Sequence, residues 1–214
     1  MYHFEFVSRK KRAPVKKDLI SLIRETQDLL RDDFTFRFDF VGSDKRNMVT
    51  YDPATNIGFD FDVNLEVNDG DGAYSAEELK RRIMGALNHV ARRYGYDYAE
   101  DSTRVITIKF KDRQNARLLH SCDFAIVHNY TDRNGRKQQQ YVHFNKEQGS
   151  YTWKQQPEGY YMLPEKERWI TRTGRRNELR KLYLDKKNAN FNSDKRAHSL
   201  YVEAVNEICQ RHGF

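Results

Sequence analysis

The stretch Phe59-Asp60-Phe61-Asp62-Val63 alternates apolar side chains with aspartates. A period of two is typical of a β-strand, in which successive side chains point to opposite faces. Asp60 and Asp62 therefore leave the same face, about 7 Å apart along the chain at the usual strand rise. Two neighbouring carboxylates repel each other unless a cation lies between them. Because Mg²⁺ prefers carboxylate and phosphate oxygens, the pair predicts a site for Mg²⁺ or Mn²⁺.

A second alternating stretch, residues 34–40, leads into Val41-Gly42-Ser43. It predicts another strand, which ends in a glycine-serine turn. Glycine lets the backbone approach a ligand closely. The serine hydroxyl and the free amides of a turn after a strand can cradle phosphate oxygens. We therefore expect Gly42 and Ser43 to bind phosphate groups.

Gly42-Ser43 followed by Asp60-x-Asp62 resembles the hydrophobic-Gly-Ser … Asp-x-Asp signature of the polymerase-β-type nucleotidyltransferases. The length of the gap is similar to that in the branch of oligoadenylate synthetases, cyclic GMP-AMP synthase and the bacterial CD-NTases. The resemblance implies a third carboxylate on a later, neighbouring strand, for which Asp123 is the candidate. It also implies that the three aspartates hold metal ions and are catalytic. The structural alternative is an edge strand with a solvated acidic face, next to a plain turn.

The same resemblance assigns residues near the end of the chain. In the synthase-like families, a lysine on one helix and a serine that opens the next hold the donor triphosphate, and Lys186 and Ser199 match them by pattern. Eukaryotic members often place a base-stacking tyrosine directly after this serine. This chain has Leu200 there, and Tyr201 follows one position later, so the residue that stacks on the base stays open.

We expect an α+β nucleotidyltransferase fold, with a mixed, mostly antiparallel sheet flanked by helices and a small helical C-terminal part. Residues 1–163 are expected to form the catalytic core with an N-terminal helix. Residues 164–214 are expected to pack on it as helices, and a single domain is the alternative. The predicted strands cover residues 34–40, 59–63, 105–110, 123–130 and 141–144, with a hairpin turn at 132–135. The predicted helices follow Pro14 and cover residues 76–94, 178–187 and 198–211.

The composition limits the class of protein. The chain has 214 residues, of which 32% are charged, and its formal net charge is +7, which favours nucleotides or nucleic acids as ligands without choosing between them. The length suffices for one well-buried core. No apolar run approaches a membrane span, and the N-terminus lacks the apolar region of a signal peptide. Cys122 and Cys209 show no metal-site spacing. These features predict a soluble, cytoplasmic protein without a membrane partner.

Two basic stretches have alternative interpretations. The run Arg9-Lys10-Lys11-Arg12, extended by Lys16-Lys17, and the arginine-rich face of the helix at 76–94 could contact RNA or DNA. A solvated surface is the other interpretation of both. Three histidines, at positions 120, 128 and 143, match no metal-site spacing and are expected to be ordinary strand or surface residues.

The function expected from the resemblance is Mg²⁺-dependent transfer of a nucleoside monophosphate from an NTP to a hydroxyl. Two metal ions would align the attacking hydroxyl and neutralise the leaving pyrophosphate. The favoured product is an oligonucleotide second messenger, cyclic or linear, of the kind that signals in antiviral defence. An RNA 3′ end, a protein hydroxyl or a small molecule are alternative acceptors. The alternative from another class is a non-catalytic nucleic-acid-binding module.

Overall fold

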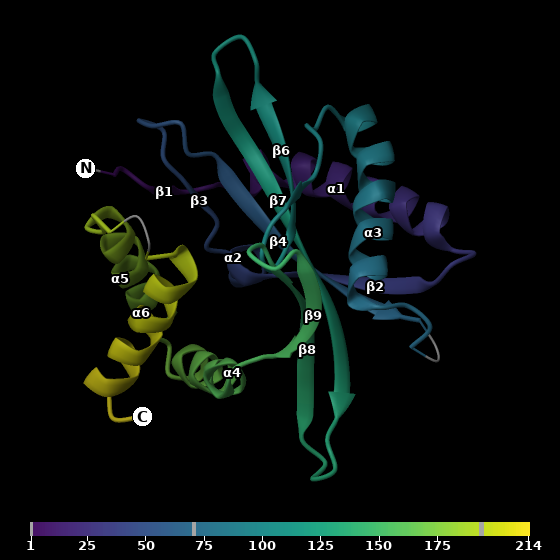
Figure 1. Cartoon of the computed structure of the whole chain (residues 1–214). Helices are drawn as coiled ribbons and strands as arrows, with labels where there is room; N and C mark the ends of the chain where they lie inside the picture. The colour runs from purple at the N-terminus through teal and green to yellow at the C-terminus, as the bar shows by residue number, and fades with distance from the viewer. Residues whose placement is uncertain (1, 70–71, 193–194) are drawn as a thin grey trace. The chain divides into compact units, whose positions relative to one another are not determined.

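The computed structural model describes residues 2–69, 72–192 and 195–214, and Figure 1 labels most of its helices and strands. The chain forms two compact units. The sheet unit comprises Val7–Val49 and Asn56–Gln156. The helical unit comprises Met1–Phe6, Thr50–Thr55 and Pro157–Phe214. The predicted boundary after residue 163 thus falls inside a helix of the helical unit, which also includes two N-terminal segments.

The sheet unit is built on a seven-stranded sheet with the order β2-β4-β7-β6-β5, in which β8 pairs with β7 and β9 with β8. Strands β4 and β7 run parallel and the other neighbours run antiparallel, so the prediction of a mixed, mostly antiparallel sheet is confirmed. The strands are β2 (Thr35–Val41), β4 (Phe59–Asn68), β5 (Glu100–Asp101), β6 (Ile106–Asp112), β7 (Arg117–Thr131), β8 (Lys137–Asn145) and β9 (Ser150–Gln155).

Strand β7 is longer than predicted, because its 15 residues pair with different strands along their length. Its first part pairs with β4 and β6, and its last part pairs with β8. The turn to β8 is the predicted hairpin, in which Asp132 Oδ1 accepts hydrogen bonds from the backbone N–H groups of Asn134 and Arg136. Gly135 has a φ of 76°, which this turn requires and glycine adopts readily. Strand β9 was not predicted.

One face of the sheet carries the core of the unit. Along β4 every second side chain is buried, beginning with Phe59, as the alternation predicts. Helix α1 (Arg9–Leu30) packs against α3 (Ala76–Ala91), which is followed by the short helix η1 (Arg92–Tyr94). Both helices contact the sheet. Their buried faces complete the core with Leu19, Leu22, Ile23, Leu79, Ile83, Leu87 and Val90.

Helix α3 begins with the capping box that the sequence indicates. The Ser75 hydroxyl accepts the Glu78 N–H, and the Glu78 carboxylate accepts the Ser75 N–H. Lys80 differs from the expected solvated face, because it is only 1% exposed. Its Nζ lies 2.7 Å from Asp101 Oδ1 and donates to the Ser102 carbonyl, so this lysine anchors α3 to β5.

Helix α1 begins earlier than predicted, at Arg9 instead of after Pro14. The reason is an N-cap at Ser8, whose hydroxyl accepts the Lys11 N–H. The basic run is therefore the first turn of a helix. Arg12 in this turn is buried, and its guanidinium lies 2.5 Å from the Asp44 carboxylate, in α2 (Gly42–Arg46). Lys16 contacts the other Asp44 oxygen at 2.6 Å. Two of the basic side chains therefore form ion pairs within the fold.

The helical unit contains a small antiparallel pair, β1 (Glu5–Phe6) with β3 (Thr50–Tyr51), and three helices. Asn188 ties the N-terminal segment to this unit, because its Oδ1 accepts the Phe4 N–H at 2.6 Å. The helices are α4 (Glu158–Arg172), α5 (Arg176–Asn188) and α6 (Ala197–Arg211). The last two confirm the helices predicted at 178–187 and 198–211. Within the described ranges, no helix combines the length and apolar character that crossing a membrane requires.

We expect Asp44→Ala to destabilise the protein strongly. The side chains of Arg12 and Asp44 are only 8% and 4% exposed, and removing one partner of a buried ion pair costs about 3–5 kcal/mol, because the other charge stays buried without compensation. Urea unfolding measures this loss. Asp32→Ala removes an exposed carboxylate after α1 and serves as the control, with a change within about 0.5 kcal/mol. Equal stabilities for the two variants would show that the buried ion pair between Arg12 and Asp44 does not stabilise the fold.

Candidate active site

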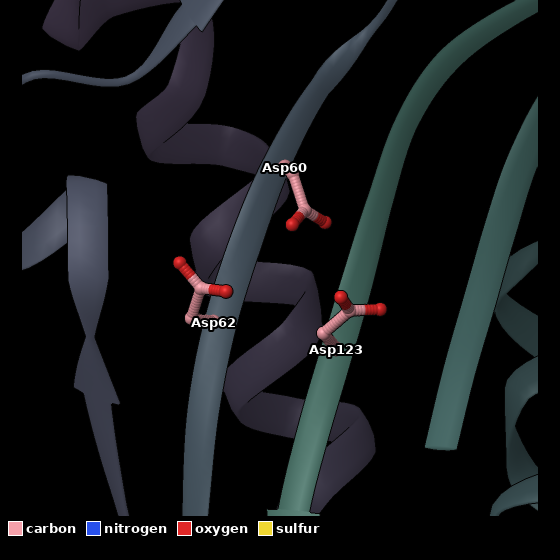
Figure 2. A group of neighbouring side chains, drawn as sticks. All are labelled: Asp60, Asp62 and Asp123. Atoms are coloured by element: carbon pink, nitrogen blue, oxygen red, sulfur yellow. The ribbon is translucent and has the colours of Figure 1, made fainter. Parts of the chain in front are cut away.

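Three carboxylates come together on the face of the sheet opposite the core. Asp60 and Asp62 lie on β4 and Asp123 on β7, and the parallel register places Asp62 directly opposite Asp123. Each of the three offers one oxygen, and these oxygens lie within 4.8 Å of one another. Figure 2 shows the three carboxylates gathered in front of the two strands, with α1 behind them. The structure thus brings together the three predicted catalytic aspartates, which we call the acidic triad.

The glycine-serine turn contacts this triad directly. Gly42 has a φ of 58°, and a Cβ at this position would lie 2.1 Å from Asp62 Oδ2. Only glycine therefore fits against the Asp62 carboxylate. The backbone N–H of Ser43 donates a hydrogen bond to the same carboxylate. This amide thus donates to Asp62, and the expected binding of phosphate by Gly42 and Ser43 stays a prediction.

The electrostatics of the triad reflect crowding of like charges. Burial raises the pKa of Asp60 well above its usual 3.8, and the charges of Asp123 and Asp62 raise it further. Burial and the charge of Asp123 raise the pKa of Asp62 to about 6, although the Ser43 N–H and the Arg46 charge lower it. Two of the three carboxylates are therefore costly to ionise in the protein alone. A bound cation would relieve this cost.

Two hydroxyl groups hold the triad, and the sequence analysis missed both. Ser121 Oγ donates to Asp60 Oδ1 at 2.8 Å, and Thr107 Oγ1 donates to Asp123 Oδ1 at 2.5 Å. Ser121 lies on β7 and Thr107 on β6. In sequence both are ordinary polar positions of alternating strands. The signal that could find them is their place on the same strand face as the aspartates, two residues before Asp123 in the case of Ser121.

The other predicted ligand residues belong to the helical unit. Lys186 lies on α5 and pairs with Glu207 of α6 at 2.7 Å. Ser199 is exposed in the first turn of α6. Tyr201 is buried, with 5% of its surface exposed, and its hydroxyl donates to Glu167. Its ring is therefore part of the packing of the helical unit and does not offer a stacking surface for a base.

The histidines do not form a metal site with the triad. His120 and His128 lie on β7 and His143 on β8, as expected of strand residues. His120 is buried between aromatic rings, with Phe110 stacked on it at 4.8 Å. Burial lowers its pKa to about 4, so this ring is neutral at pH 7. Among the described residues, the group whose side chains could share a metal ion is the acidic triad.

Comparison with solved structures finds bacterial CD-NTases whose folds are similar to that of this chain. The STING-associated CdnE c-di-GMP synthase from Capnocytophaga granulosa has a TM-score of 0.60 at 15% identity, and the match covers 98% of this chain and 64% of that chain. The Vibrio cholerae di-nucleotide cyclase DncV in complex with GTP has a TM-score of 0.56 at 15% identity, over 88% of this chain and 52% of that chain. The CD-NTase CdnG from Bradyrhizobium diazoefficiens in complex with GTP has a TM-score of 0.51 at 15% identity, over 84% of this chain and 43% of that chain.

Protein-family models and curated proteins gave no match in the corresponding comparisons. The chain spans between 43% and 64% of the length of the three solved structures above. At these sequence identities the likeness shows the fold. The predicted resemblance to the bacterial CD-NTase branch is thereby confirmed in three dimensions: the chain has the nucleotidyltransferase fold of these proteins.

Proposed function

We propose that this protein is a Mg²⁺-dependent nucleotidyltransferase, which transfers a nucleoside monophosphate from an NTP to a hydroxyl group. The observation that carries the proposal is the acidic triad, in which one oxygen of each carboxylate lies within 4.8 Å of the others, next to a turn where any side chain in place of Gly42 would displace Asp62. The nucleotidyltransferase fold supports it, because the solved structures with this fold include synthases of cyclic dinucleotides.

The side chains of the triad fit a hard divalent cation. They supply only oxygen ligands, as Mg²⁺ and Mn²⁺ prefer. The raised pKa values of Asp60 and Asp62 reflect crowded negative charge, which the nearby Arg46 offsets only in part at Asp62. Asp60, Asp62 and Asp123 would hold the metal. When bound, divalent ions supply Lewis-acid activation of the α-phosphate and charge neutralisation of the leaving pyrophosphate.

The remaining roles follow from the chemistry of the transfer. Asp123 would complete the metal site on the acceptor side and help to deprotonate the attacking hydroxyl, as a carboxylate can in general base catalysis. The Ser43 hydroxyl would bind the β- or γ-phosphate, next to Gly42. Lys186 and Ser199 of the helical unit would add a charge and a hydroxyl for the triphosphate. Use of Lys186 would require it to exchange its partner Glu207 for phosphate.

The favoured product is a cyclic or linear oligonucleotide of the second-messenger kind. The structural likeness to a c-di-GMP synthase and a di-nucleotide cyclase supports a nucleotide hydroxyl as acceptor. RNA ends, proteins and small molecules are the other acceptors to compare in the assay.

The nucleic-acid-binding module has weaker support, because many of its expected cations are already paired. Arg12 contacts Asp44, and Lys80 contacts Asp101. Three of the four arginines between residues 76 and 94 also form ion pairs with carboxylates. These pairs are Arg81 with Glu77, Arg82 with Asp33, and Arg93 with Glu25.

The direct test is incubation of the purified protein with each labelled NTP and Mg²⁺ or Mn²⁺, with and without RNA or DNA, followed by chromatography of the products. We expect pyrophosphate release and a new oligonucleotide. Asp60→Asn and Asp62→Asn should each reduce turnover by more than about 100-fold, since even a residue that only supports a metal ligand contributes about 10- to 100-fold. Salt-sensitive nucleic-acid binding without metal-dependent NTP binding would overturn the proposal in favour of the binding module.

A second prediction concerns stability without metal. The unfolded chain ionises Asp62 near pH 4, whereas the folded protein does so near pH 6. The folded state therefore holds the extra proton between these values, and its stability falls as the pH rises through this window. A pKa raised from 3.8 to about 6 corresponds to about 3 kcal/mol. In EDTA at pH 7.5, Asp62→Asn should thus be more stable than the wild type by up to about 3 kcal/mol.

Chemical unfolding at several pH values measures this difference, which should shrink towards zero near pH 4. Excess Mg²⁺ should stabilise the wild type and leave the variant unchanged, because a ligand that binds only the folded state stabilises it. Asp32→Asn, at an exposed position, is the control. A difference that does not depend on pH would show that the charge of Asp62 is not the cause.

The contact between Gly42 and Asp62 gives a third prediction. Gly42→Ala places a methyl group where the Asp62 carboxylate lies, so we expect loss of nucleotidyl transfer comparable to that of Asp62→Asn. Gly135→Ala is the matched control, because Gly135 also has a positive φ, of 76°, but has open space around its Cα. Both variants carry the backbone strain, and only the first disturbs the triad. Equal activities in the two variants would show that the contact between Gly42 and Asp62 is not needed for nucleotidyl transfer.

A further inference from the structure

We propose that Thr107 and Ser121 are positioning residues, which hold the metal-binding carboxylates of Asp123 and Asp60 in place for the divalent ion. This inference rests on the proposed function and adds two residues to it. Neither hydroxyl needs to touch the substrate. Each acts through the aspartate to which it donates a hydrogen bond.

The strand register explains why these two hydroxyls reach the triad. Thr107 on β6 is the direct antiparallel partner of Asp123. Ser121 on β7 is the direct parallel partner of Asp60 on β4. Partners in register on neighbouring strands share a face of the sheet, which places their side chains within reach of each other. The distances of 2.5 Å for Thr107 and 2.8 Å for Ser121 are those of hydroxyl–carboxylate hydrogen bonds.

Such bonds matter for a metal site because a free carboxylate rotates about χ2. An ionised carboxylate has about four lone-pair sites, so one hydroxyl donor leaves capacity for an ion. The donor also fixes which oxygen points to the centre of the triad. Groups that hold ligands in this way typically contribute 10- to 100-fold to metal affinity or activity.

The third carboxylate, that of Asp62, accepts a hydrogen bond from the backbone instead of from a hydroxyl. Asp62 accepts the backbone N–H of Ser43, in the glycine-serine turn. The three donors come from three different elements: β6, β7 and α2. All three are uncharged, so they orient the carboxylates without replacing the cation, as a lysine or arginine in the same place would.

The experiment measures metal binding separately from turnover. Electron paramagnetic resonance of free Mn²⁺ gives the affinity of the wild type, Thr107→Val, Thr107→Ser and Ser121→Ala. Valine keeps the shape and strand preference of threonine, and serine restores the hydroxyl. Thr152→Val, at an exposed position of β9, is the matched control. Melting temperatures in EDTA report whether each variant is folded.

We expect Thr107→Val and Ser121→Ala to weaken Mn²⁺ binding by about 10- to 100-fold. In the assay they should require more Mg²⁺ for half-maximal rate, and Thr107→Ser and Thr152→Val should resemble the wild type. If the wild type binds Mn²⁺ and turns over NTP while Thr107→Val and Ser121→Ala bind Mn²⁺ equally well, the inference is wrong and the proposed function stands. If the wild type binds no Mn²⁺ and transfers no nucleotide, both are overturned.

Discussion

Backbone hydrogen bonds between the parallel strands β4 and β7 place Asp62 opposite Asp123, and the geometry of the site depends on that register. The arrangement is unfavourable by itself. Two unit charges about 5 Å apart repel by about 3 kcal/mol at an effective dielectric constant of about 20. The opposite faces of the same strands offset this repulsion, because Phe61 and Phe124 are fully buried there. Burial of each such side chain contributes about 1.5–3 kcal/mol. The core therefore holds the carboxylates together.

Local patterns in the sequence predict the parts of this site that depend on one strand or one turn. The alternation from Phe59 to Val63 places both aspartates on one face, as the structure confirms. Gly42 is constrained by close contact with a side chain, which agrees with the glycine of the motif. Asp123 required the resemblance to nucleotidyltransferases, because nothing local to its strand marks it. The structure places it beside Asp62 through a pairing of residues 61 positions apart.

Long-range contacts determine the features that the sequence analysis missed. Thr107 and Ser121 look like any polar residue of a half-buried strand until the register of β6, β7 and β4 is known. Arg12 looks solvated within a run of four basic residues, yet it is buried against Asp44, 32 positions later. Lys80 is similar, because its partner Asp101 lies on a different element. In each case the partner decides whether a polar residue is buried, and the partner is distant in sequence.

The hydrogen-bond donors around the triad are neutral, and this distinguishes a metal site from a structural network of ion pairs. Arg12 with Asp44 and Lys80 with Asp101 show how this chain neutralises buried charge elsewhere, by direct contact between a cation and a carboxylate. The triad is treated differently. Its donors are the hydroxyls of Ser121 and Thr107 and the amide of Ser43, which fix the orientation of the carboxylates but add no charge. Because these donors are neutral and the charge of Arg46 offsets the crowding at Asp62 only in part, the triad keeps a concentration of negative charge, which suits a divalent ion.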